Sequence, residues 1–203
     1  MTITASAVEP PQEAVPIAAS RAWAVLIGGV IGLVASVTLT VEKIKLLMDS
    51  GYVPSCNFNP VLSCGSVMVT PQASVLGFPN PLMGIVAFTV VVVTGVLAVA
   101  KVPLPQWYWT GLALGTLAGA GFVHWLIFQS LYRIGALCPY CMVVWAVTVC
   151  LLVIFAALAS EQGGIRKNLQ HLHRWRWTIA ALWFIALFLL IFIRFQDYWI
   201  TLL

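Results

Sequence analysis

The chain has 203 residues, of which 62% are hydrophobic and only 8% are charged, and its mean hydropathy is +1.01. A soluble domain of this length carries about a quarter charged residues. The composition therefore excludes an ordinary soluble enzyme and indicates an integral membrane protein. The net charge of +4 requires no nucleic-acid partner, because basic loops on one side of a membrane explain it.

Residues 1–20 contain two acidic residues, Glu9 and Glu13, and three prolines. They lack the basic start of a secretory signal peptide. We expect them to form a disordered cytoplasmic tail, followed by a first span that is not cleaved. The transmembrane domain is expected to cover residues 22–195.

Five apolar runs are long enough to cross a bilayer, whose core of about 30 Å requires roughly 20 residues as a helix. Backbone groups inside a bilayer must be bonded within the segment, so each run is expected to be helical. The predicted fold is an all-α membrane protein with five transmembrane helices. The spans are expected at about 23–48, 81–100, 107–132, 139–159 and 177–195, with an outer loop at 51–80.

The first span is expected to project beyond the bilayer, where Glu42 and Lys43 would be solvated surface charges. In the outer loop, the pair Asn59-Pro60 predicts the start of a short helix, with Asn at the cap and Pro at the first helical position. This helix would carry Cys64 and end near Gly65. Cys56 would precede it in extended chain.

The third span contains two features that bear on packing and chemistry. The series Gly111-x3-Gly115-x3-Gly119 permits close packing against another helix. His124 is the one titratable residue inside this span, and polar groups at such depth usually face the interior of a bundle. It would either lie on a proton path or form a hydrogen bond with a neighbouring helix.

The fourth span opens with Cys138-Pro139-Tyr140-Cys141. Pro139 suits the first helical position, so Cys138 is expected near the cap, where free N–H groups and the helix dipole favour a thiolate. Cys141 lies one turn deeper on the same face and can form a disulfide with Cys138. Two sulfurs at different depths suit a relay between water and membrane.

The outer loop supplies a second pair, Cys56 and Cys64, and four cysteines permit three pairings. Haem attachment would require His where Met142 stands. No metal is expected, because ligation would block redox use and no His is near in sequence. A structural staple is a weaker alternative, since a Cys-x-x-Cys ring is small and contributes little loop entropy. The pairs favour thiol–disulfide exchange.

The basic residues at the span ends predict the orientation. Six are expected on the side of the N-terminal tail and four on the opposite side, and the loop at 161–176 dominates this bias. The first group is Arg21, Lys101, Arg166, Lys167, Arg174 and Arg176, and the second is Lys43, Lys45, Arg133 and Arg194. The N-terminus is therefore expected in the cytoplasm, with both cysteine pairs outside the cell membrane, where disulfides persist.

Over about residues 22–195 the chain resembles bacterial members of the vitamin K epoxide reductase family. The resemblance rests on Cys56-x7-Cys64 in the first outer loop, Phe78-Pro-Asn-Pro-Leu-Met-Gly84 entering the second span, and Cys138-Pro-Tyr-Cys141 heading the fourth. Bacterial disulfide oxidases of the four-helix type fit less well, because their Cys-x-x-Cys lies in the first outer loop.

The resemblance implies a four-helix bundle around a quinone, with menaquinone more expected than ubiquinone, a fifth helix outside it and the outer loop as a lid. The chain lacks the thioredoxin domain that many homologues carry, so a separate thioredoxin-like partner outside the membrane is implied. By position, Cys56 would take electrons from this partner, Cys64 would pass them to Cys138, and Cys141 would deliver them to the quinone. Asn80 matches a carbonyl-bonding Asn, and Trp145 stands where family members often have Tyr.

The sequence thus predicts a membrane thiol:quinone oxidoreductase that supports disulfide formation. Its quinone contacts would include Asn80 and Trp145, with His124 as a further candidate. The competing hypothesis is a membrane scaffold or transporter subunit with two structural disulfides and no catalytic activity.

Overall fold

The computed structural model describes residues 17–49, 51–160 and 166–200. Of the predicted tail at 1–20, residues 1–16 lie outside the described part of the chain. The first helix begins at Ala19. The helices of the described part are α1 (Ala19–Met48), α2 (Cys64–Met68), α3 (Asn80–Val99), α4 (Gln106–Gln129), α5 (Pro139–Ser160), α6 (Arg166–Arg194) and α7 (Gln196–Ile200). A 3₁₀ turn, η1 (Pro71–Ser74), and a π-helical turn, η2 (Ser130–Ile134), complete the elements.

Five helices, namely α1, α3, α4 with η2, α5 and α6, are long and apolar enough to cross a membrane. The protein is therefore a multi-pass membrane protein, and the predicted all-α fold with five spans is confirmed. The segment 166–176 differs from the expectation, because it is helical rather than part of a loop. Its Arg, Lys, Leu and Gln residues are good helix formers, so the helix continues beyond the apolar run.

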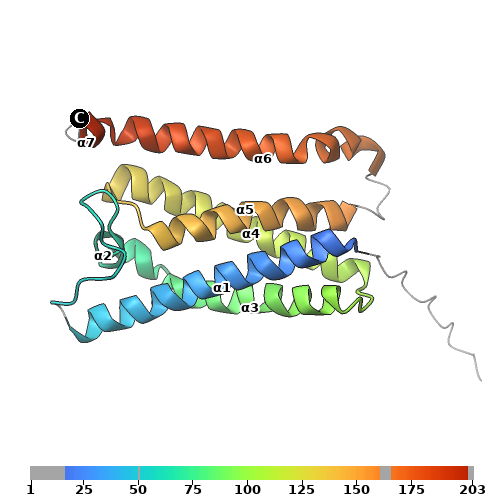
Figure 1. The fold of residues 1–203 in the computed structure, drawn as a ribbon, viewed down its shortest axis with the longest axis horizontal. Coiled ribbons are helices and arrows are strands. Elements are labelled where there is room, and N and C mark those ends of the chain that lie inside the picture. The colour runs from blue at the N-terminus through green and yellow to red at the C-terminus, as the bar shows by residue number, and fades with distance from the viewer. Residues whose placement is uncertain (1–16, 50, 161–165, 201–203) are drawn as a thin grey trace, which may run out of the picture.

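Four of the long helices form one bundle (Figure 1). α1 packs against both α3 and α5, and α4 packs against α5, whereas α3 and α4 make little direct contact. α6 lies at the edge of the bundle and touches α5. Only 6% of the most apolar stretch of α6 is buried inside the protein, against 44% for α5. The fifth long helix is therefore peripheral.

A cavity of about 930 Å³ with largely apolar walls occupies the centre of the four-helix bundle. Residues of α1, α3, α4 and α5 line it. Gly111, Gly115 and Gly119 face this space, and nothing lies within 4 Å of a Cβ placed on any of them. The close helix packing that these glycines would permit does not occur at them. The glycines instead leave open space in the wall that α4 forms, beside lining side chains such as those of Leu112 and Thr116.

Close helix packing occurs between α1 and α3 instead. A Cβ on Gly95 would lie 2.5 Å from the Cα of Leu26, which is shorter than any normal contact. A Cβ on Gly32 would similarly overlap the ring of Phe88. In a membrane, where lipid is as apolar as the side chains, such close backbone approach is a main source of helix association.

We expect Gly95→Ala to destabilise the bundle by about 1–3 kcal/mol, because the added methyl group would push α1 and α3 apart. Gly111→Ala is the matched control, since its methyl group would enter open space. Thermal unfolding of both variants in detergent would measure the difference. Equal melting temperatures for the two variants would contradict this assignment of the packing face.

Candidate functional site

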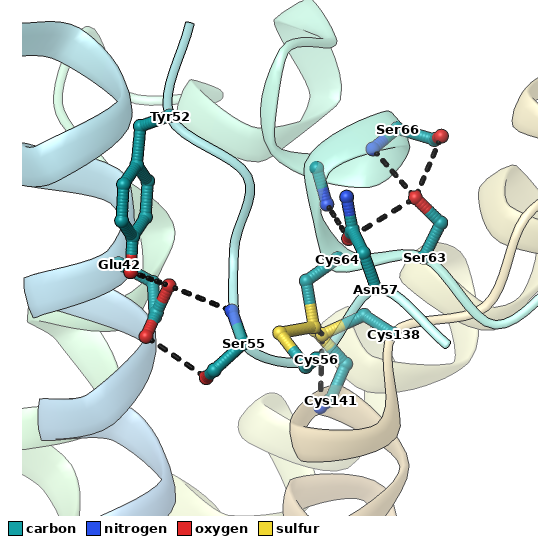
Figure 2. The surroundings of a disulfide bond; sticks show 11 residues. Glu42, Tyr52, Ser55, Cys56, Asn57, Ser63, Cys64, Ser66, Cys138 and Cys141 are labelled. Atoms are coloured by element: carbon teal, nitrogen blue, oxygen red, sulfur yellow. Dashed lines mark hydrogen bonds between the residues drawn. A yellow bond between two sulfur atoms is a disulfide. The ribbon is translucent and has the colours of Figure 1, made fainter. Parts of the chain in front are cut away.

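Both cysteine pairs lie at the same end of the bundle, which we call the thiol end (Figure 2). Cys56 and Cys64 come from the loop between α1 and α3 and form a disulfide. Cys138 precedes the first turn of α5, and Cys141 lies within that turn. The sulfur of Cys138 lies 3.4 Å from the sulfur of Cys64. A free thiol of one pair is thus in contact with the disulfide of the other.

A short piece of backbone pairing sets this contact. Leu62 in the loop and Leu137 before α5 form a parallel bridge. The N–H of Leu137 donates to the carbonyl of Val61 at 2.7 Å, and the N–H of Ser63 donates to the carbonyl of Leu137 at 2.9 Å. One cysteine follows each paired segment, so the pairing brings the two sulfurs together across 74 positions of sequence.

The helix that carries Cys64 begins later than the sequence predicted. α2 starts at Cys64 itself, and Ser63 caps it by accepting a hydrogen bond from the N–H of Ser66 at 3.2 Å. Asn59 begins no helix, because its side chain accepts from the N–H groups of Val61 and Leu62 and closes a turn. Ser is as good a cap as Asn, and the backbone pairing of the loop with the segment before α5 places Ser63 rather than Asn59 at the start of the helix.

Asn57 fastens the first turn of α2 to the loop. Its side-chain oxygen accepts from the N–H of Gly65 at 2.9 Å and from the hydroxyl of Ser63 at 3.2 Å (Figure 2). A Cβ on Gly65 would lie 2.9 Å from the Asn57 amide nitrogen, so any other residue here would displace this amide. Gly65 occupies the second position of α2. The prediction that the helix ends near Gly65 is therefore wrong, because the helix continues to Met68.

The disulfide is closed off from solvent. Cys56 and Cys64 are 2% and 0% exposed, and Cys138 is 1% exposed. Cys138 and Cys141 both line the central cavity, and neither residue of the disulfide does. The four cysteines therefore form one cluster, with the Cys138–Cys141 pair on its cavity side.

The pKa of the Cys138 thiol lies below its ordinary value. The main cause is a hydrogen bond from the side chain of Cys141. Burial acts in the opposite direction, and the backbone N–H groups of Cys141 and Tyr140, at the start of α5, add to the lowering. Cys138 is therefore the thiol of this pair that is prepared to react as a thiolate.

Two of the residues expected to contact a quinone line the cavity. Trp145 is 2% exposed and packs among the apolar residues at the thiol end. Asn80 is the first residue of α3, where Pro79 rather than Asn80 is the cap. The Asn80 amide accepts from the N–H of Val75 and donates to the carbonyl of Gln72, both in the loop around η1. An amide carries two donor hydrogens, so one N–H of Asn80 remains for a ligand.

The structure does not bring His124 to the cavity lining. Its Nδ1 bonds to the carbonyl of Ala120 at 2.7 Å, and the indole N–H of Trp183 on α6 donates to its Nε2 at 2.8 Å. A neutral ring satisfies both contacts. Of the two roles considered for His124, the structure shows the bond to a neighbouring helix.

The expectation that Glu42 is a solvated surface charge is wrong. Its side chain is 5% exposed rather than solvated, and it accepts hydrogen bonds from Tyr52 and Ser55. Leu39 and Leu46, which pack on the cysteine cluster, lie three residues before and four residues after it. This helical spacing could have placed Glu42 on the inward face of α1.

The family model described as "Vitamin K epoxide reductase family" matches residues 23–156, about two thirds of the chain. The match includes all four cysteines of the site and the four helices that surround the cavity, apart from the ends of α1 and α5. No curated protein matches the chain.

We expect Cys141→Ala to raise the pKa of Cys138 toward the ordinary cysteine value, because it removes the largest stabilisation of the thiolate. A lowered pKa keeps the thiolate present at lower pH and loses it only as pH falls through that value. In protein whose disulfides are first reduced, so that Cys138 is a free thiol in both forms, alkylation of Cys138 by N-ethylmaleimide, read by peptide mass spectrometry between about pH 5 and 9, would therefore shift to higher pH in the variant. Cys150→Ala is the control, and an unchanged profile in Cys141→Ala would contradict the hydrogen bond.

Proposed function

The chain belongs to the vitamin K epoxide reductase family, and from this we propose that it is a membrane thiol:quinone oxidoreductase that reoxidises a thioredoxin-like protein outside the cytoplasm. The observation that carries the proposal is the 3.4 Å contact between the Cys138 sulfur and the Cys56–Cys64 disulfide. It joins two redox-active pairs directly, and the second pair borders an apolar cavity.

The first exchange takes place with the partner. A thiolate of the reduced partner attacks Cys56, the Cys56–Cys64 bond breaks, and Cys64 leaves as a thiolate. The other thiol of the same partner then attacks the partner sulfur that is bonded to Cys56, and Cys56 leaves as a thiolate. The partner leaves as a disulfide, and the loop keeps both electrons as the two thiols of Cys56 and Cys64.

The second exchange is internal. The thiolate of Cys64 attacks Cys138 of an oxidised Cys138–Cys141 pair, and Cys141 leaves as a thiolate. Cys56 then attacks Cys64, which restores the loop disulfide and releases Cys138 as a thiolate. The pair Cys138–Cys141 now holds the two electrons beside the cavity. The described arrangement, with the loop oxidised and Cys138 and Cys141 free, corresponds to this stage of the cycle.

The cavity fits a quinone as the final electron acceptor. Its apolar walls suit a ring system and an isoprenoid lipid, and the remaining N–H of Asn80 can donate to a ring carbonyl. Trp145 would contact the ring. The quinone takes two electrons and two protons and leaves as quinol, while Cys138 and Cys141 close their disulfide. Thioredoxin-like oxidants of this kind have potentials near roughly −120 mV, so the acceptor must be more oxidising.

The proposed function also requires a particular orientation of the protein in the membrane. The thiol end lies opposite the end at which α1 begins (Figure 1). The excess of basic residues on the side of the chain's start favours the cytoplasm for that side. The disulfide would then face the extracytoplasmic side of the cell membrane, where the thioredoxin-like partner would be found. This compartment is oxidising, so disulfides persist there.

We expect purified protein to retain a naphthoquinone rather than a benzoquinone, in line with the preference for menaquinone that the family resemblance implies. Extraction of the protein with organic solvent, followed by chromatography and mass spectrometry, would identify the bound species. Ubiquinone as the main extracted species would contradict the choice of menaquinone and leave quinone reduction itself in place.

We expect Cys141→Ala to abolish quinone reduction by a reduced thioredoxin-like protein, because the second pair can no longer form its disulfide. In this variant Cys138 attacks Cys64, and a Cys64–Cys138 crosslink with a free Cys56 should accumulate. Non-reducing proteolysis and mass spectrometry would detect it. Cys150→Ala, which changes the fifth cysteine, should retain activity.

The scaffold hypothesis predicts a different result for the same variants. A scaffold with structural disulfides would show no turnover in the unaltered protein, and Cys141→Ala would lower its stability only. Detection of the Cys56–Cys64 bond alone in Cys141→Ala would contradict the proposed relay order.

A further inference from the structure

The carboxylate of Glu42 is attached to the chain segment that leads into Cys56 (Figure 2). It accepts hydrogen bonds from the hydroxyl of Tyr52 at 2.9 Å, from the N–H of Ser55 at 3.3 Å and from the hydroxyl of Ser55 at 3.0 Å. Ser55 is the residue directly before Cys56. These contacts therefore hold both ends of a four-residue segment against α1, and we call Glu42, Tyr52 and Ser55 the Glu42 clamp.

The next residue of α1 fastens the other side of the disulfide. The ammonium group of Lys43 donates to the carbonyl of Met68, the last residue of α2. Glu42 thus holds the chain before Cys56, and Lys43 holds the chain after Cys64. Glu42 and Lys43, which are adjacent charged residues of α1, therefore restrain the disulfide loop from both sides.

A buried carboxylate destabilises a protein unless hydrogen bonds replace its water. Glu42 is 5% exposed, and its three hydrogen bonds come from the loop rather than from the surrounding helices. An apolar residue at this position would pack against Leu39 and Leu46 without such a requirement. The charge therefore serves to specify where the loop lies.

Building on the proposed function, we propose that Glu42 is a positioning residue that holds the Cys56–Cys64 disulfide against Cys138 and closed to solvent, and that the partner reaches Cys56 when the Glu42 clamp opens. The two exchange steps require opposite states of the clamp. Internal exchange requires the closed state, in which Cys64 and Cys138 are 3.4 Å apart. Attack by an external thiol requires an accessible sulfur, and Cys56 is only 2% exposed while the clamp is closed.

The test measures how fast a water-soluble phosphine reduces the loop disulfide in the full-length protein in detergent. The phosphine, tris(2-carboxyethyl)phosphine, gives two electrons to the disulfide and becomes its oxide, so neither quinone nor partner is needed. We expect Glu42→Gln to be reduced roughly tenfold faster, the factor that one hydrogen bond to a charged group provides. Tyr52→Phe should change the rate in the same direction by less, and Glu42→Asp, which keeps the charge, should restore part of the protection.

A second measurement reports on the closed state. In the Cys141→Ala background, adding Glu42→Gln should lower the yield of the Cys64–Cys138 crosslink. Asp49→Asn is the matched control, because it removes an acidic charge from the same end of α1, where the side chain of Asp49 accepts only from the N–H of Gly51 among the described hydrogen bonds, and its backbone bonds to Lys45 and Tyr52 do not depend on the charge. Both readouts should be unchanged in Asp49→Asn.

Alkylation of Cys150, deep in α5, distinguishes positioning from general loosening of the fold. Faster phosphine reduction with unchanged Cys150 alkylation and unchanged melting temperature supports the proposal. Equal phosphine rates in Glu42→Gln and the unaltered protein would overturn it, as would a parallel rise in Cys150 alkylation. Absence of quinone reduction in the unaltered protein would refute the proposed function without affecting these measurements.

Discussion

The parallel pairing of Leu62 with Leu137 is the constraint on which the site depends. Helix packing positions side chains only to within the tolerance of apolar contacts, whereas two backbone hydrogen bonds of 2.7 and 2.9 Å fix the register of two segments. The cysteines that follow these segments are therefore held in contact, although 74 positions separate them. Capping of α2 by Ser63 and Asn57 then fixes the direction of the Cys64 side chain.

The bundle provides the second half of the site, the cavity, because α3 and α4 make little direct contact. The helices of the bundle contact one another mainly through α1 and α5. α3 and α4 touch through the hydrogen bond between Thr94 and Tyr108, and the cavity remains between the four helices. The glycines of α4 keep that wall open. Cys138 and Cys141 line the cavity at the thiol end, so this thiol pair lies directly beside an apolar space.

Polar residues near the membrane have separate tasks in this fold. Glu42 and Lys43 tie the loop to α1, and His124 ties α6 to α4 through Trp183. In each case the cost of placing a polar group in an apolar region is offset by hydrogen bonds to another segment. The family match and the joined thiol pairs make the protein a membrane thiol oxidoreductase, and these contacts keep its reactive parts in register.

The sequence by itself determined the five membrane-crossing helices, the placement of Cys138 at a helix start and the family, because apolar length, charge segregation and motif spacing are local properties of the chain. It did not determine that α2 begins at Cys64, that the glycines of α4 line a cavity, or that Glu42 is buried. Each of these depends on which faces of distant segments meet. Only the tertiary structure decided them, because hydrogen-bond partners and close contacts between segments leave no periodic signal in either segment alone.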